Sequence, residues 1–357
     1  RASWPTQGWT SRAEQVAKDR AARVAALEQY AFTLTGSDEE RKGIRTDGVV
    51  IVHGGEVVYE RYGRGFTAEK RHLSWSVSKS FTNALTGLAV AEGAITLDDS
   101  VCKHLTLSDS SLCAITVRHL LEFASGIDWR ETYEGQSNQV SSVLAMLYGE
   151  GRRDIVSFVA SHPLRDPPGE TFMYSSGDTN LLAGVLTAAL KPRHGERFPF
   201  TLLLEPLGMR SATWERDGKG VIVGSSYLYA TPRDLAKFGY FLLSDGCWEG
   251  RRLLPEGWVE ASTALSEPFR KRPLEVDEDD RQGRQFWLNK PVPEQNKGLA
   301  WPDVPEDAFA ARGHWGQSIT VIPSLDLVIV RVADDRESGA FQFNTFVPLA
   351  IAVARDR

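Results

Sequence analysis

The sequence has few of the features that mark metalloproteins, nucleic-acid-binding proteins and membrane proteins. Its 7 histidines and 3 cysteines are dispersed, with no HExxH motif and no pairs at zinc-ligand spacing. Lys and Arg total 41 against 47 Asp and Glu, and no basic stripe of the kind that binds nucleic acid is present. No apolar run approaches the roughly 18 residues of a membrane span. We therefore expect no metal ion, no organic cofactor, no nucleic-acid partner and no membrane span.

Two further absences concern enzyme class. No Gly-x-Ser-x-Gly sequence is present, which disfavours the hydrolases that carry their serine on a strand-to-helix elbow. The segment 63–68 imitates a dinucleotide-binding fingerprint, but no helix follows it where that motif requires one.

The three cysteines leave the redox state open. Cys102 and Cys113 bracket a short loop-like stretch, which fits a local disulfide and equally fits two separate thiols, while Cys247 is solitary. The chain begins at Arg1 rather than at methionine, which fits a removed presequence and equally a start inside a longer gene. A periplasmic or secreted bacterial protein is favoured over a cytoplasmic one.

Hydrophobic periodicity places strands near both ends of the chain and helices between them. The β-rich runs 48–53 and 56–62 flank Gly54-Gly55 and predict a hairpin. Charged, proline-bearing 268–284 is expected to be an exposed loop. Helices are expected at 13–33, 76–92, 117–124, 140–148, 155–161, 180–190, 232–243 and 344–354, and further strands at 286–289, 308–312, 318–323 and 327–332.

This order predicts an α/β (α+β) fold in which the two ends of the chain together form one α/β domain, with a helical domain inserted between them. Residues 1–99 and 285–357 would form the α/β subdomain, and 100–284 the mainly helical inserted subdomain. The 357 residues would thus make one unit, 1–357.

The first chemical motif is Ser76-Val77-Ser78-Lys79, at the start of the expected helix 76–92. A serine hydroxyl needs a base within hydrogen-bond reach, and residues three apart lie on the same helix face. A buried lysine loses its charge more easily, as a base must. Backbone N–H groups at the helix start suit a developing oxyanion. The alternative is a capping serine beside a solvated lysine.

Two more motifs follow along the chain. Tyr174-Ser175-Ser176 comes after a rigid Pro-Pro-Gly turn, and its tyrosine could shuttle a proton, especially as a phenolate beside an ammonium. His314-Trp315-Gly316-Gln317 leads into a strand whose edge a substrate could approach closely. Each also has a purely structural interpretation, as a half-buried loop tyrosine and a glycine-rich strand entrance.

In this order the three motifs resemble the class C β-lactamase and D-alanyl-D-alanine carboxypeptidase superfamily of penicillin-recognising serine hydrolases. The likeness is greatest to its 6-aminohexanoate-dimer hydrolase and esterase branch. It implies a β-lactamase/DD-peptidase-like fold, an antiparallel sheet flanked by helices with an inserted helical domain. Segments 73–81, 116–121, 125–129 and 229–236 share the likeness, whereas 268–305 does not.

The resemblance assigns roles to single residues. Ser76 resembles the acylated nucleophile, Lys79 its proton partner and Tyr174 the tyrosine of the Tyr-x-Asn element. The backbone N–H groups of Ser76 and Gln317 are implied to form the oxyanion hole. Lys79 and Tyr174 together would act as general base and acid.

The sequence departs from the family pattern where substrate binds. Ser176 replaces the asparagine of Tyr-x-Asn, and His314 and Trp315 replace the lysine and threonine of Lys-Thr-Gly, leaving Gly316. Trp315 is expected to narrow the cleft. Tyr133 resembles the tyrosine of a mobile, substrate-capping segment in the amide-hydrolase branch. These five residues are the expected substrate-binding set.

The expected protein is therefore a serine hydrolase acting on a short amide or ester through a Ser76 acyl-enzyme. A class C-type β-lactamase or D-alanyl-D-alanine carboxypeptidase is the first alternative, which the departures at 176, 314 and 315 disfavour. A non-catalytic penicillin-binding-type sensor is the second. The natural substrate and the oligomeric state stay open.

Overall fold

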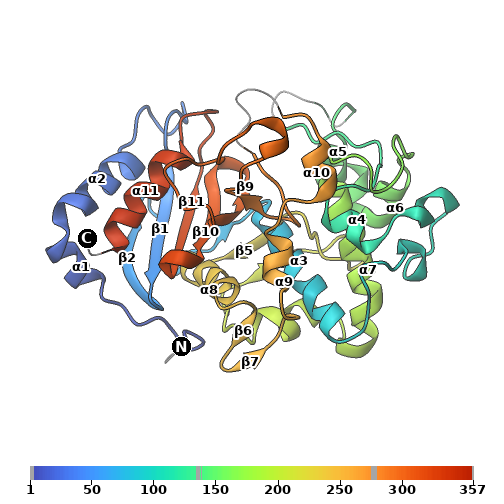
Figure 1. Cartoon of the computed structure of the whole chain (residues 1–357), viewed down its shortest axis with the longest axis horizontal. Coiled ribbons are helices and arrows are strands. Elements are labelled where there is room, and N and C mark those ends of the chain that lie inside the picture. The colour runs from blue at the N-terminus through green and yellow to red at the C-terminus, as the bar shows by residue number, and fades with distance from the viewer. Residues whose placement is uncertain (1–3, 134–136, 138, 275–279, 356–357) are drawn as a thin grey trace.

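A central antiparallel sheet organises the molecule, whose computed structural model describes residues 4–133, 137, 139–274 and 280–355 (Figure 1). Its six strands run in the order β2-β1-β11-β10-β9-β8, so that strands from the two ends of the chain pair directly. The strands are β1 Thr46–His53, β2 Glu56–Tyr62, β8 Trp287–Leu288, β9 Phe309–Gly313, β10 Gln317–Ile322 and β11 Leu327–Ala333.

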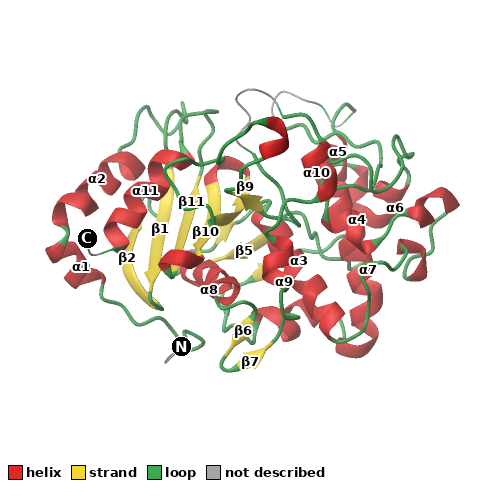
Figure 2. Ribbon diagram, viewed as in Figure 1, coloured by secondary structure: helices red, strands yellow, loops and turns green. Residues whose placement is uncertain are grey.

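Helices cover both faces of this sheet (Figure 2). In β1 successive side chains point to opposite faces, so Val49 and Ile51 join the cluster under the terminal helices while Val50 and Val52 join the larger core. This is why the strand is buried throughout except at His53. The covering helices are α1 Ala13–Asp19, α2 Ala21–Phe32 and α11 Phe343–Ala354 on one face, and α3 Val77–Ala91 and α8 Pro232–Leu243 on the other.

Of the remaining helices, α9 (Trp258–Ser262) packs directly against α3 and most of the others lie beyond α3, where they form the helical part of the molecule (Figure 2). They are α4 Val117–Leu121, α5 Ser142–Tyr148, α6 Ile155–Ala160, α7 Ser176–His194, α9 Trp258–Ser262 and α10 Glu267–Lys271. Two small sheets complete the described fold, with strands β3 His72–Leu73, β4 Thr213–Trp214 and β5 Leu228–Ala230, and β6 Cys247–Trp248 and β7 Arg251–Arg252. The short helical turns are η1 Val101–Lys103, η2 Ser110–Ala114, η3 Glu150–Arg153, η4 Phe200–Leu204, η5 Pro293–Gln295, η6 His314–Gly316 and η7 Pro323–Leu325.

The predicted single helix 13–33 is wrong, because Arg20 leaves the helical region with φ −128° and ψ 33°. Its buried side chain donates to the carbonyl oxygen of Val353 at 2.7 Å. The break therefore lets a guanidinium tie the first helices to the C-terminal helix.

Helix α7 begins at Ser176 and not at 180 as predicted, because the Ser175 hydroxyl accepts from the Asp178 N–H at 2.9 Å and caps it. The earlier start places Ser176 in the first turn. The predicted exposed loop 268–284 is also wrong where it is described: α10 occupies its beginning, and Arg281 and Gln282 are buried. Residues 275–279 lie outside the described part.

The subdomain boundaries 1–99, 100–284 and 285–357 remain a prediction. Helix α8 nevertheless lies within 100–284 and packs on the main sheet, where a side chain at Gly239 would collide with Val328 and Ile319. Cys102 and Cys113 form a disulfide, with Cα atoms 5.1 Å apart, and Cys247 is free. No helix in the described ranges is long and apolar enough to cross a bilayer.

Candidate active site

Ser76 lies at the N-terminal end of α3, in a turn that backbone hydrogen bonds hold in place. Trp75 before it has φ +50°, a conformation that side-chain-bearing residues rarely adopt. The N–H groups of Val77 and Ser78 donate to the carbonyl oxygens of Ser74 and Trp75 at 3.2 and 3.0 Å. This turn places Ser76 at the start of the helix, where the residue lines a cavity of about 570 Å³.

Lys79 lies one helical turn further, fully buried beside Ser76. Its Nζ donates to Ser76 Oγ at 3.0 Å, to Ser176 Oγ at 2.9 Å and to the Ser225 carbonyl at 3.3 Å. Burial lowers the pKa of Lys79 to about 8, although the carboxylate of Glu131 acts in the opposite direction. The structure thus brings the predicted pair together and gives the lysine access to its neutral form.

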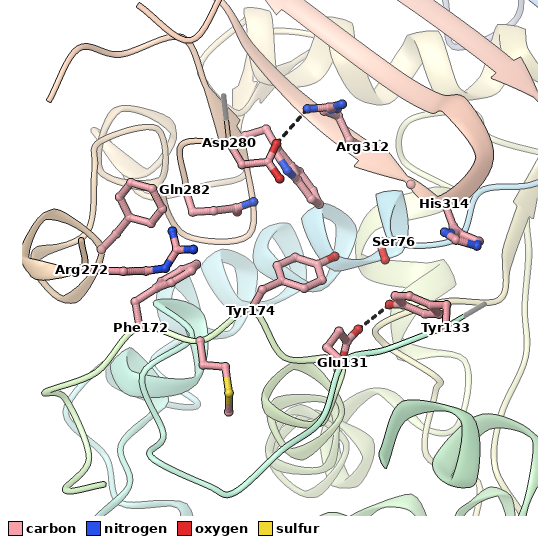
Figure 3. A pocket seen from close by; sticks show the side chains of 14 residues that line it. Ser76, Glu131, Tyr133, Phe172, Tyr174, Arg272, Asp280, Gln282, Arg312 and His314 are labelled. Carbon is pink, nitrogen blue, oxygen red and sulfur yellow. Dashed lines mark hydrogen bonds and ion pairs between the residues drawn. The ribbon is translucent and has the colours of Figure 1, made fainter. Parts of the chain in front are cut away.

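Tyr174 directs its hydroxyl toward Ser76 from the loop before α7 (Figure 3). Its ring packs between Phe123 and Trp287, and the Lys79 Nζ lies 4.8 Å from the ring centroid. Burial and the nearby negative charge of Glu131 raise the pKa of Tyr174 well above 10, outweighing a hydrogen bond with Ser76 that lowers it. This direction favours the protonated phenol over the phenolate form that the sequence left open.

Glu131 is the site residue that sequence reasoning missed. Its carboxylate accepts from Tyr133 OH and Ser176 Oγ, both at 2.5 Å, from Trp129 Nε1 at 2.6 Å and from the Ser176 N–H at 2.9 Å. The one sequence signal was its position two residues before Tyr133 in the loop already singled out. A carboxylate with four donors is a fixed part of the site.

Ser176 is placed differently from its expected role in substrate binding. It is 1% exposed and lies between Lys79 and Glu131, and it does not line the cavity. A residue in the first turn of α7 faces the base because Ser175 starts the helix there.

Tyr133 and His314 lie side by side in the cavity wall (Figure 3). Their rings stack with centroids 4.8 Å apart and planes inclined by 27°, and both residues line the cavity. The remaining wall is largely aromatic and charged. The lining residues are Ser76, Glu131, Tyr133, Phe172, Met173, Tyr174, Phe269, Arg272, Asp280, Gln282, Trp287, Arg312, Gly313 and His314 (Figure 3).

Arg312 and Asp280 add an ion pair to this cavity that the sequence did not indicate. Arg312 Nη1 donates to Asp280 Oδ1 at 3.1 Å across the cavity wall (Figure 3). Because these opposite charges are paired, the two residues together add little net charge to the cavity. In the described ranges, no group of three or more His, Cys, Asp or Glu residues is arranged to hold a metal ion.

Gly313 lets the end of β9 approach the nucleophile turn. A Cβ at this position would overlap the Ser74 carbonyl oxygen and lie 3.1 Å from the Ser76 nitrogen. The buried Gln317 side chain donates to the His314 and Ala333 carbonyls at 3.0 and 2.6 Å. Any contribution of Gln317 to an oxyanion site therefore has to come from its backbone N–H.

The sequence suggested that Trp315 narrows the cleft, but Trp315 does not line this cavity. With φ +59°, its ring meets Trp75 edge-on at 5.3 Å and lies under the Arg336 guanidinium, and it lines a second cavity of about 820 Å³. Gly316 does not line the cavity either. A side chain at this position would overlap the buried Arg331–Asp335 ion pair. Both residues shape the turn that presents His314.

A family described as Beta-lactamase has a model that matches residues 20–350. A 6-aminohexanoate-dimer hydrolase of Paenarthrobacter ureafaciens is 28% identical over 247 residues, covering 68% of this chain. The match spans only 63% of that relative, less than two thirds of its length.

Solved structures show the same fold at low sequence identity. A Bacillus anthracis protein provisionally named 6-aminohexanoate-dimer hydrolase superposes with a TM-score of 0.71 at 22% identity, over 87% of this chain and 79% of that one. EstCE1, a hydrolase with promiscuous acyltransferase activity, superposes with a TM-score of 0.66 at 16% identity, over 96% and 99%. These likenesses confirm the predicted antiparallel sheet flanked by helices.

Proposed function

The chain belongs to the Beta-lactamase family, and from that membership and the contacts of Ser76 we propose that it is a serine hydrolase cleaving a small amide or ester. The observation that carries the proposal is the 3.0 Å contact between Lys79 Nζ and Ser76 Oγ. With its pKa lowered to about 8, Lys79 is neutral in a useful fraction of molecules near neutral pH.

Acylation follows from these positions. Neutral Lys79 takes the Ser76 proton, and Oγ attacks the carbonyl carbon to give a tetrahedral intermediate. Its oxyanion rests on the backbone N–H groups of Ser76 and Gln317. The Tyr174 phenol gives its proton to the leaving nitrogen or oxygen, and the Lys79 ammonium returns one to Tyr174. The carbon–leaving-group bond breaks and the Ser76 ester remains.

Deacylation repeats the sequence with water as the nucleophile. Lys79, neutral again, takes a proton from water as the water attacks the acyl carbon. Collapse of the second intermediate returns the proton to Ser76 Oγ and releases the acid. No proton is left over, so the site returns to its starting state.

The cavity favours a short, weakly charged substrate. Its aromatic walls bury apolar chain, and its Arg312–Asp280 pair is internally neutralised. His314 stands in place of the lysine that engages penicillin carboxylates in the family, and Ser176 is turned away from the cavity. The name of the Paenarthrobacter ureafaciens relative supports a linear amide as substrate. The Cys102–Cys113 disulfide supports a periplasmic or secreted location.

Turnover of three substrates tests the proposal: p-nitrophenyl acyl esters, a 6-aminohexanoate dimer and a chromogenic cephalosporin. Each is assayed with the full chain, with Ser76→Ala and with Ser111→Ala, an exposed serine outside the cavity. We expect ester or amide turnover that Ser76→Ala abolishes and Ser111→Ala retains, with an acyl adduct on Ser76 by mass spectrometry.

The other outcomes overturn the proposal in distinguishable ways. Cephalosporin turnover faster than that of the other substrates identifies a β-lactamase. A stoichiometric burst without turnover identifies a penicillin-binding-type sensor. Full activity of Ser76→Ala rejects Ser76 as the nucleophile.

A further inference from the structure

The loop that carries Glu131 is fixed against the start of α7. Trp129 is buried, and a side chain at Gly177 would overlap its ring, so the two segments pack without a gap. The Trp129 indole N–H and the Ser176 backbone N–H both donate to Glu131 Oε2, at 2.6 and 2.9 Å. Loop and helix thus hold one carboxylate in one orientation.

The Ser176 hydroxyl connects this carboxylate to the lysine. Ser176 has a single hydroxyl proton, which it donates to Glu131 Oε1 at 2.5 Å. Its lone pairs then face Lys79 Nζ, which donates to it at 2.9 Å. Because Glu131 can only accept when ionised, it sets the direction of both hydrogen bonds.

We propose that Glu131 is a positioning residue for Lys79, acting through the hydroxyl of Ser176. The inference rests on the proposed function of Ser76 and Lys79. When the Ser76 Oγ–H bond breaks and the Nζ–H bond forms, the new ammonium finds an oriented acceptor already in place. The proton stays on Lys79, and Glu131 neither gains nor loses one.

The charges around this chain of contacts have opposed effects. Burial favours neutral Lys79, and Glu131 favours its ammonium. Glu131 also interacts electrostatically with Tyr133, Tyr174 and the buried carboxyl of Asp178. Further away, Asp280 raises the pKa of Tyr174 and Arg312 lowers it. Removing the Glu131 charge should therefore lower the pKa of Lys79 further.

The test is the pH dependence of kcat/KM on a p-nitrophenyl ester for the full chain. Lys79 must be neutral to act, so activity rises with pH through its pKa. In Glu131→Gln we expect this limb to move to lower pH by roughly one unit, with kcat at the plateau reduced at least 10-fold. Glu131→Asp should restore the position of the limb in part, because it restores the charge.

Two further variants separate positioning from folding. Ser176→Ala breaks the link and keeps the charge, so we expect a reduced plateau with a smaller shift of the limb. Asp178→Asn removes a different carboxyl, which is buried on the same helix as Ser176, and the Lys79 limb of this variant should stay in place. Circular dichroism checks that every variant is folded.

A limb at the same pH in Glu131→Gln and wild type overturns the inference. An equal shift in Asp178→Asn overturns it too, because any lost charge would then suffice. Both results leave Ser76 as nucleophile if Ser76→Ala is inactive. Activity of Ser76→Ala would instead reject the proposed function itself.

Discussion

The ring of Tyr133 stacks on the ring of His314, with centroids 4.8 Å apart, and so joins the loop after Trp129 to the turn between β9 and β10. Both rings line the cavity at Ser76. In Tyr133→Ala the stacked pair is lost and the cavity opens, so we expect KM to rise about 10-fold or more. Tyr133→Phe keeps the ring and loses only the bond to Glu131. Steady-state kinetics with equal KM for both variants would contradict a role for the stack.

Tyr174→Phe should reduce kcat by roughly 100- to 1000-fold, since proton delivery to a leaving group contributes that much. The raised pKa of Tyr174 keeps the phenol protonated, so it serves as the donor. The loss should be larger for an amide than for a p-nitrophenyl ester, whose leaving group needs no proton. Assays of both substrates test this expectation, and equal losses of kcat would argue that the hydroxyl does not protonate the leaving group.

Asp178 makes stability depend on pH. Burial raises the pKa of its carboxyl from 3.8 to about 7. The stability that its protonated form contributes is complete below pH 3.8 and is lost as pH rises through 7. Asp178→Asn should therefore be about 4 kcal/mol more stable than wild type at pH 8, with the difference vanishing toward pH 4.

Urea unfolding at both pH values measures this difference. Glu256→Gln, which removes an exposed carboxylate, is the matched control and should show no such pH dependence. A constant difference between Asp178→Asn and wild type would contradict the assignment.

Gly313→Ala should lower kcat/KM by at least 10-fold, because its Cβ would overlap the Ser74 carbonyl oxygen and push β9 away from the nucleophile turn. Gly298→Ala is the control, since nothing lies within 4 Å of a Cβ there. Kinetics and thermal unfolding of both variants test the close approach. Wild-type activity in Gly313→Ala would show that the turn tolerates displacement.

Thiol titration of the unreduced, denatured chain should find one reactive cysteine, Cys247, and three after reduction. Replacing both Cys102 and Cys113 by serine should cost about 3 kcal/mol of unfolding free energy for a loop of this separation. Cys247→Ser should cost little. Three thiols before reduction would contradict the disulfide.

Local periodicity accounts for the parts of the fold that the sequence predicted well. The β-rich runs on either side of Gly54-Gly55 predicted the β1–β2 hairpin, and the spacing of apolar residues after Ser76 predicted α3. Helix boundaries were poorer, because a single cap at Ser175 or a break at Arg20 depends on local hydrogen bonds rather than on period.

By itself the sequence determined that Ser76 and Lys79 share a helix face, because three residues make nearly one turn of any helix. It could not reveal Glu131, whose partners come from a loop, from α7 and, through Ser176, from α3. Nor could it tell that Trp315 turns toward the second cavity while His314 faces the first. Only the tertiary structure decided these points, because they depend on contacts between segments distant along the chain, which no local spacing encodes.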